Sequence, residues 1–170
     1  MKKLLLIGLV LILSTSLFAV ADMRLDLGLQ NTNLALDMNL SQSNSKTQFT
    51  AVIDASFTAT FDKGIGFYCS FEPDFVGGKF GLGAGFSYKL KLGNKADCFI
   101  QVGPTFAFGN SVTLIGADFM AFFDFLVTNN MYVKLGAGTQ FEFAQLSKGG
   151  NTNNVKLHVP LPSVALGWKF

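Results

Sequence analysis

The chain has 170 residues and a formal net charge of +2, and 49% of its residues are hydrophobic, including 19 phenylalanines. So small a charge argues against a nucleic-acid partner, which requires a basic face. The one histidine, His158, excludes a histidine-rich metal site, and the two cysteines, Cys69 and Cys98, give no zinc spacing.

The first residues have the order of a secretory signal. Two lysines precede an apolar run at 4–13, polar serine and threonine follow, and Ala19-Val20-Ala21 provides an A-x-A-like cleavage site. The apolar run has about half of the ~20 residues that a spanning helix needs. We therefore expect residues 1–21 to be removed as a signal peptide and residues 22–170 to form one domain.

Apolar residues then alternate with polar or small ones, which is the period of a strand and not of a helix. In 49–61, for example, phenylalanine, isoleucine and alanine hold the odd positions, while threonine, aspartate and serine hold most of the even ones. The predicted strands, in chain order, are 23–41, 48–61, 65–73, 79–92, 97–108, 111–127, 131–146 and 155–170.

The length of these strands decides between two all-β folds. A soluble sandwich would also alternate, but its strands run near ~5 to 6 residues, whereas a tilted membrane strand needs ~9 to 11. A membrane chain without apolar helices must close its sheet, because lipid tolerates no unpaired backbone groups. We predict an eight-stranded antiparallel up-and-down transmembrane β-barrel in contact with outer-membrane lipid. Short connections at 62–64, 93–96 and 128–130 indicate periplasmic turns, and longer ones at 41–47 and 147–154 indicate outward loops.

The first strand contains a change of phase. Its leucines are odd-numbered up to Leu29 and even-numbered from Leu34, so the break falls at Gln30, Asn31, Thr32 and Asn33. A turn there would give nine strands, whereas a β-bulge produces the same switch within one strand. The even number of strands expected for such barrels favours the bulge.

Counting residues from the short turns gives the height of each inward-facing charged residue along the barrel axis. By height, these residues fall into two groups. The lower group mixes signs and is predicted to pair as an electrostatic plug: Arg24, Asp26, Lys89, Lys91, Asp124, Lys134 and Lys169. The upper group is acidic: Asp37, Asp54, Asp118 and Glu142. Charges in a narrow lumen need partners. The alternative is that some of the lower group project into periplasmic water at the strand ends.

Two prolines interrupt the last predicted strand. They fall at the same height along the barrel axis as the change of phase in the first predicted strand. Pro160 and Pro162 have no N–H to donate, and closure of eight strands makes the first and last strands neighbours. One interpretation is a weak seam with a lateral path into the bilayer. The other is that the prolines mark where the last strand leaves the membrane.

The ending, residues 164–170, alternates apolar residues and closes on phenylalanine. It resembles the last strand of bacterial outer-membrane proteins, which implies an assembly signal at Leu166, Trp168 and Phe170, read by the barrel-assembly machinery. The whole chain is similar to small eight-stranded outer-membrane barrels, particularly the outer-membrane protein W type. That resemblance implies a bacterial outer-membrane location and the passage of small, often hydrophobic molecules.

No pattern of catalytic residues is present, so we expect neither an enzyme nor a cofactor. Gly81, Gly83 and Gly85 alternate inside a strand instead of opening a helix, so they indicate packing and not a phosphate loop. Two functions remain: a narrow passive channel or binding barrel for a small-molecule solute, and a structural or adhesion barrel acting through its loops. The plain composition of 147–154 favours the first.

Overall fold

A computed structural model describes residues 20–31, 51–75, 78–109, 111–147, 150, 156–158 and 163–170. Its strands are β1 (Val20–Asn31), β2 (Ala51–Phe61), β3 (Ile65–Asp74), β4 (Lys79–Lys91), β5 (Ala96–Gly109), β6 (Val112–Leu126), β7 (Met131–Ser147), β8 (Lys156–His158) and β9 (Ser163–Lys169). The predicted signal peptide, apart from Val20 and Ala21, lies outside these residues. Within them, no helix is long and apolar enough to cross a membrane.

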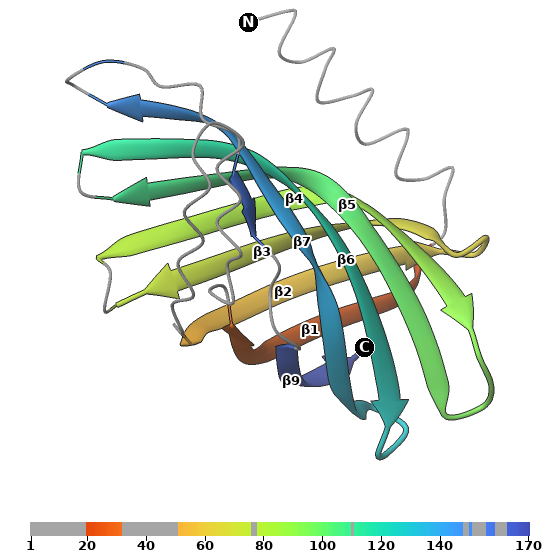
Figure 1. Ribbon diagram of the computed structural model, residues 1–170. Coiled ribbons are helices and arrows are strands. Elements are labelled where there is room, and N and C mark those ends of the chain that lie inside the picture. The colour runs from red at the N-terminus through yellow and green to blue at the C-terminus, as the bar shows by residue number, and fades with distance from the viewer. Residues whose placement is uncertain are drawn as a thin grey trace, which may run out of the picture.

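The strands form one closed antiparallel ring (Figure 1). Consecutive strands pair from β1 to β7, and β9 lies between β7 and β1. The short strand β8 pairs with β7, and both β8 and β9 fall within the predicted last strand. The ring therefore has eight strands, and the predicted eight-stranded up-and-down β-barrel is confirmed.

The register of β1 is regular over its upper part. Gln30 and Asn31 pair with Val52 and Ala51 without a shift, and the irregularity of this ladder lies between Val20 and Asp22. Thr32, Asn33, Pro160 and Pro162 lie outside the described residues. The phase break and the proline seam thus stay predictions.

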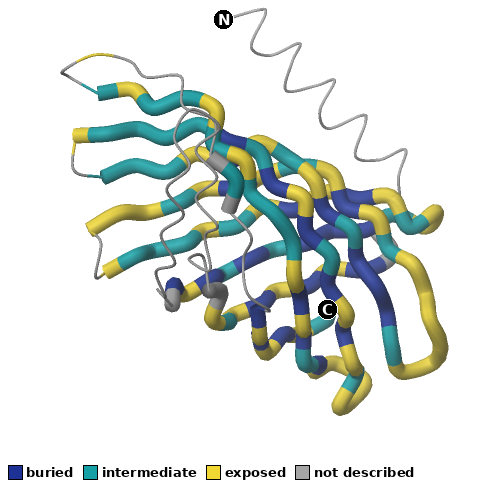
Figure 2. The backbone as a smooth tube through the Cα atoms, in the orientation of Figure 1, coloured by how far each residue is buried: buried dark blue, intermediate teal, exposed yellow. Residues whose placement is uncertain are grey.

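The barrel is inverted relative to a soluble protein, with apolar side chains outside and polar ones inside. Figure 2 shows buried and exposed residues alternating along the strands. In β1, Leu25, Leu27 and Leu29 are 47%, 58% and 59% exposed, whereas Arg24 and Asp26 are 1% exposed. Water-soluble monomers rarely expose so large an apolar surface. The outer face is therefore suited to the hydrocarbon of a bilayer.

Aromatic side chains are paired near both ends of the barrel. The ring centroids of Phe61 and Phe67 are 6.2 Å apart beside the β2–β3 turn, and those of Phe80 and Phe108 are 5.1 Å apart toward the opposite end. Trp168, in β9, is 42% exposed. This placement agrees with the interfacial aromatic girdles of membrane barrels.

The two cysteines are free thiols on different strands. Cys69 belongs to β3 and Cys98 to β5, and β4 separates them.

The two ends of the barrel differ. The short-turn end carries the start of β1, the end of β9 and the tight turns 62–64, 92–95 and 127–130. In the first of these turns Gly64 has a φ of +80° and donates its N–H to Phe61 O at 2.9 Å, a conformation that favours glycine. The opposite end is called the loop end. By the usual orientation of such barrels, the short-turn end faces the periplasm.

We expect the refolded protein to give a β-type circular dichroism spectrum and to migrate differently in gels before and after heating. The reason is that a closed ring pairs its backbone groups and leaves no edge from which unfolding can start. Electrophoresis of detergent-folded protein measures this directly. A helical spectrum, or a monomer that stays soluble without detergent, would contradict the membrane barrel.

Candidate functional site

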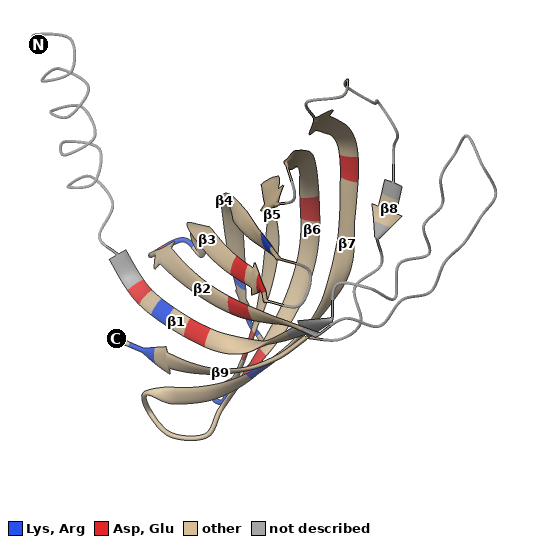
Figure 3. Cartoon of the chain, turned by 90° about the vertical axis from the view of Figure 1, so that its left-hand side faces the viewer, with Lys and Arg blue, Asp and Glu red and all other residues tan. Residues whose placement is uncertain are grey.

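The lower half of the lumen is organised around Arg24, which β1 directs into the interior. Its Nη1 donates to Asp124 Oδ2 at 2.7 Å, and its Nη2 donates to Asp22 Oδ2 at 2.8 Å and to Asp97 Oδ2 at 2.5 Å. Figure 3 shows the acidic, basic, acidic order of this part of β1. Asp97 and Asp124 come from β5 and β6, so one guanidinium joins strands on different sides of the ring. Its planar fork of donors suits this task.

Aromatic rings pack against the same guanidinium. Arg24 Cζ lies 4.7 Å from the ring centroid of Phe99 and 5.0 Å from that of Tyr132. The Tyr132 hydroxyl donates to Asp26. Both aromatic residues are 1% exposed, so they fill the cross-section beside the charge while contributing cation–π attraction.

Lysines complete the pairing of the carboxylates. Lys134 pairs with Asp26, and its Nζ lies 4.8 Å from the Phe122 ring centroid. Lys89 contacts Asp22, and its Nζ lies 3.2 Å from Asp97 Oδ2. Lys169 Nζ lies 3.7 Å from Asp22 Oδ2.

We call these eight residues the lower cluster. Its four cations are Arg24, Lys89, Lys134 and Lys169, and its four carboxylates are Asp22, Asp26, Asp97 and Asp124. The charges therefore balance. Balance matters because an unpaired charge in a buried site costs several kcal/mol.

The structure brings six of the seven predicted plug residues into the lower cluster. The seventh, Lys91, is exposed at the short-turn end and makes no salt bridge within the described part of the chain. Sequence reasoning missed Asp22 and Asp97. Both share the inward parity of their strands, but Asp22 lies one residue before the predicted first strand, and Asp97 is the first residue of its predicted strand, directly beside a turn.

The middle of the lumen contains Asp54 and Asp118, two members of the acidic group described from the sequence. These residues are 7% and 9% exposed, and the Tyr68 hydroxyl donates to Asp118 Oδ1 at 2.5 Å. Glu72, which sequence reasoning missed, joins them around a cavity of about 20 Å³. Asp54 Oδ1 has no hydrogen-bond partner among the described residues. Asp37, predicted at this level, lies outside them.

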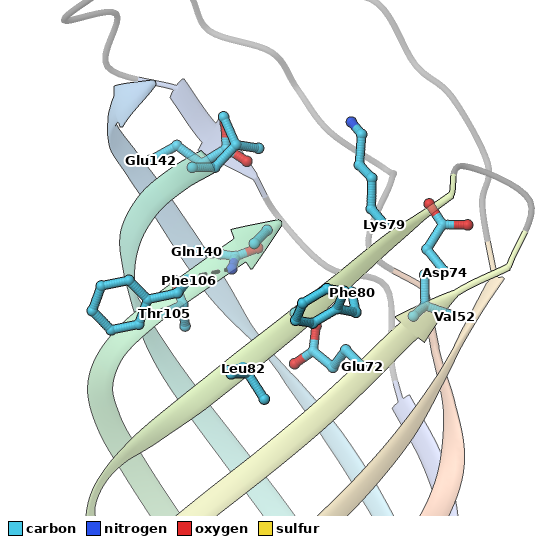
Figure 4. Close-up of a pocket in the computed structure, with 13 residues that line it drawn as sticks. Val52, Glu72, Asp74, Lys79, Phe80, Leu82, Thr105, Phe106, Gln140 and Glu142 are labelled. Carbon is cyan, nitrogen blue, oxygen red and sulfur yellow. Dashed lines mark hydrogen bonds between the residues drawn. The ribbon is translucent and has the colours of Figure 1, made fainter. Parts of the chain in front are cut away.

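A larger pocket of about 130 Å³ opens toward the loop end (Figure 4). It is lined by three carboxylates, Glu72, Asp74 and Glu142, and by one cation, Lys79. Its polar wall includes a hydrogen bond of 3.2 Å from Gln140 Nε2 to Thr105 Oγ1. The apolar part of the lining includes Val52, Leu82, Ala107 and Leu114. We call this the loop-end pocket.

Among the described residues, no group of three or more histidine, cysteine, aspartate or glutamate side chains is arranged to hold a metal ion. The carboxylate of Asp118 accepts a hydrogen bond from the Tyr68 hydroxyl.

Comparison with known proteins finds no matching family model and no matching curated protein. Solved structures with a similar fold do match. Ail, the attachment invasion locus protein of Yersinia pestis, is 10% identical with a TM-score of 0.56, covering 89% of this chain and 100% of its own. Ail in complex with the heparin analogue sucrose octasulfate is 10% identical with a TM-score of 0.53, covering 88% and 98%. The outer membrane protein OprG from Pseudomonas aeruginosa is 10% identical with a TM-score of 0.52, covering 90% and 97%.

These likenesses concern the fold. The chain has the fold of the small eight-stranded outer-membrane barrels, and the resemblance inferred from its sequence is confirmed at that level. Together with the apolar outer face, this makes the chain a barrel of the outer-membrane type.

Replacing Arg24 by methionine should destabilise the barrel by about 3 to 5 kcal/mol, because three carboxylates would lose a buried partner. Arg24→Lys should cost less, since it keeps the charge but not the fork of donors. Denaturant unfolding in lipid vesicles gives both values.

Lys95→Gln serves as the matched control, because Lys95 is an exposed cation in the β4–β5 turn. Its effect should stay within about 0.5 kcal/mol. If Arg24→Met is as stable as Lys95→Gln, Arg24 does not hold the lumen together.

Proposed function

We propose that this outer-membrane barrel binds a small molecule in its loop-end pocket and does not conduct freely along its axis. The observation that carries the proposal is the combination of a pocket at one end with a charge-balanced, buried cluster beneath it. An eight-stranded barrel is just wide enough for side chains to fill it. The lower cluster supplies that filling.

The lower cluster would act as the predicted electrostatic plug. Arg24 bridges strands across the lumen and is 1% exposed. A hydrated ion that crossed this level would have to break buried ion pairs, which is costly. Axial permeation is therefore disfavoured, and binding is the better description of what the lumen does.

The loop-end pocket indicates the class of ligand. Its volume of about 130 Å³ is close to the ~150 Å³ of an engineered cavity that takes benzene. Val52 and Leu114 offer apolar contact, and the lining also carries the carboxylates of Glu72, Asp74 and Glu142 and the ammonium group of Lys79. A small amphipathic molecule with a cationic or hydrogen-bond-donating group fits this lining best.

The alternative is an adhesion or structural barrel that acts through its loops. The solved complex of Ail contains a heparin analogue, sucrose octasulfate, which is polyanionic. The loop-end pocket of this chain is acidic, so its described residues would repel such a ligand. No described feature favours adhesion over binding in the lumen.

A lateral seam would give a hydrophobic ligand a way out. The β1–β9 ladder runs from Arg24 opposite Lys169 to Leu29 opposite Val164, and above it Gln30 and Asn31 pair with β2 alone in the described residues. Gln30 and Asn31 of the predicted seam stand at this point, and the other predicted seam residues, Thr32, Asn33, Pro160 and Pro162, lie outside the described residues. With the axis closed below, a side exit into the bilayer would add a second route to the opening at the loop end.

Membrane insertion would depend on the last strand. Leu166, Trp168 and Phe170 are 53%, 42% and 71% exposed, so they are available as the predicted assembly signal. The proposed partner is the barrel-assembly machinery during biogenesis, and lipid thereafter.

The pocket can be tested with three probes of similar size: benzylamine, benzyl alcohol and benzoate. We expect benzylamine to bind tightest and benzoate weakest, because the lining is acidic. Ala107→Leu should weaken benzylamine binding by about tenfold or more, since it fills the pocket and removes about 1.4 kcal/mol of binding. Calorimetry on the refolded barrel in detergent measures this.

Ala84→Leu is the control, because it adds the same side chain to β4 at an exposed position outside the pocket. It should leave binding unchanged. Equal affinity for the amine and the carboxylate, or equal loss in both variants, would refute the loop-end site.

The seam can be tested by a disulfide between cysteines at positions 32 and 161, with Cys69 and Cys98 replaced by alanine. Cross-linking should abolish barrel-dependent uptake of a hydrophobic naphthylamine dye by cells, and reductant should restore it. A control disulfide between positions 29 and 164, which already pair, should have no effect. Full uptake through the cross-linked seam would rule out the lateral path.

A further inference from the structure

A second opening lies at the short-turn end, and its lining has the opposite charge to that of the loop-end pocket. It has a volume of about 320 Å³ and is lined by Lys63, Lys89, Lys91 and Lys169, by Asp22 and Asp62, and by Thr60, Phe61 and Gly64. Lys89, Lys169 and Asp22 belong to the charge-balanced lower cluster, so Lys63 and Lys91 against Asp62 leave an excess of one positive charge. We call this the basic mouth.

The carboxylates of the basic mouth do not neutralise its lysines. Asp22 accepts hydrogen bonds from Arg24 and also contacts Lys89, and its Oδ2 lies 3.7 Å from Lys169 Nζ. Asp22 is thus shared by three cations, of which Arg24 and Lys89 also pair with Asp97. Lys63 and Lys91 are exposed and make no salt bridge within the described part of the chain.

Backbone hydrogen bonds hold together the strands and turns that carry these lysines. Lys89 N donates to Gly64 O at 2.7 Å, which ties β4 to the turn that carries Lys63. Lys169 N donates to Asn130 O at 2.7 Å, which ties β9 to the β6–β7 turn. Figure 3 shows basic positions in the β2–β3 turn and at the end of β9, on the same side of the barrel. Lysines from separate elements therefore converge on one opening.

We propose that the basic mouth binds a phosphate group, supplied either by a soluble phosphate or by the headgroup of an anionic phospholipid. A phosphate carries about −1.5 to −2 charges at pH 7, opposite in sign to the excess at the mouth. Its oxygens accept charge-assisted hydrogen bonds from several ammonium groups at once. Lys63, Lys91 and Lys169 would bind it, while Lys89 stays paired with Asp22 and Asp97 as the inner wall.

The location supports the same ligand chemistry. The basic mouth lies at the end where the turns leave the bilayer, and basic pockets at that level of a membrane protein take anionic headgroups. The site is at the opposite end of the barrel from the loop-end pocket, so it does not depend on the ligand proposed there.

The test uses the full barrel in nanodiscs of pure phosphatidylcholine, titrated with inorganic phosphate by calorimetry. We expect saturable binding that the double substitution Lys63→Gln with Lys91→Gln weakens by about tenfold or more, as expected for the loss of two charge-assisted hydrogen bonds. Lys95→Gln removes an exposed lysine at the same end that does not line the mouth, and it should bind like the wild type. Lys63→Arg with Lys91→Arg should retain binding.

A second arm identifies the source of the phosphate. In nanodiscs that contain phosphatidylglycerol, competition with inorganic phosphate and co-purification of the lipid with the wild type would support a headgroup site. Phosphate binding that phosphatidylglycerol does not affect would support a soluble ligand. The proposal would be overturned if the barrel bound neither inorganic phosphate nor phosphatidylglycerol. It would also be overturned if Lys95→Gln weakened binding as much as the double substitution. Heat-dependent gel migration shows that each variant is folded.

Discussion

The closed ring is the constraint on which the rest of this structure depends. In hydrocarbon, an unpaired backbone group costs several kcal/mol, so β9 must bond to both β7 and β1. Because side chains alternate along every strand, closure also sends half of them into a narrow lumen. An apolar outer face then leaves the polar half inside, where each charge needs a partner. The lower cluster is the result of that requirement.

Packing and charge hold the lower cluster together. A Cβ added at Gly167 would lie 2.2 Å from Tyr132 Cζ, and one added at Gly136 would lie 2.1 Å from Phe122 Cδ1. The inward glycines of β7 and β9 thus leave the space that aromatic rings from β6 and β7 occupy. Those rings flank Arg24 and Lys134, so enlarging the small residues or removing the rings would displace the charges they support.

Much of this arrangement could be predicted from one sequence, because parity along a strand decides which side chains face inward. Parity identified Arg24, Asp26 and Lys134, and height above the short turns placed Asp54 and Asp118 above them. It did not identify Asp22 and Asp97, because both lie where a predicted strand begins, and the sequence does not distinguish an inward strand position there from a position in the turn. Nor did it predict the contacts of Phe99 and Tyr132 with Arg24, since these depend on which strands face each other across the ring. The tilt of the strands and the cross-section of the barrel decide which strands face each other. Neither follows from the alternation of apolar and polar residues in the sequence.

The distribution of charge along the axis gives the two ends different chemistry. The basic mouth is followed by the neutral lower cluster, then by the acidic middle and the acidic loop-end pocket. A cation entering from the loop end would find growing attraction and then a level at which every carboxylate is already paired. An anion from the other end would meet lysines first and the same closed level next. The balanced cluster therefore lies between two openings with different lining charges, and a ligand bound at either end, as we propose, would not cross to the other.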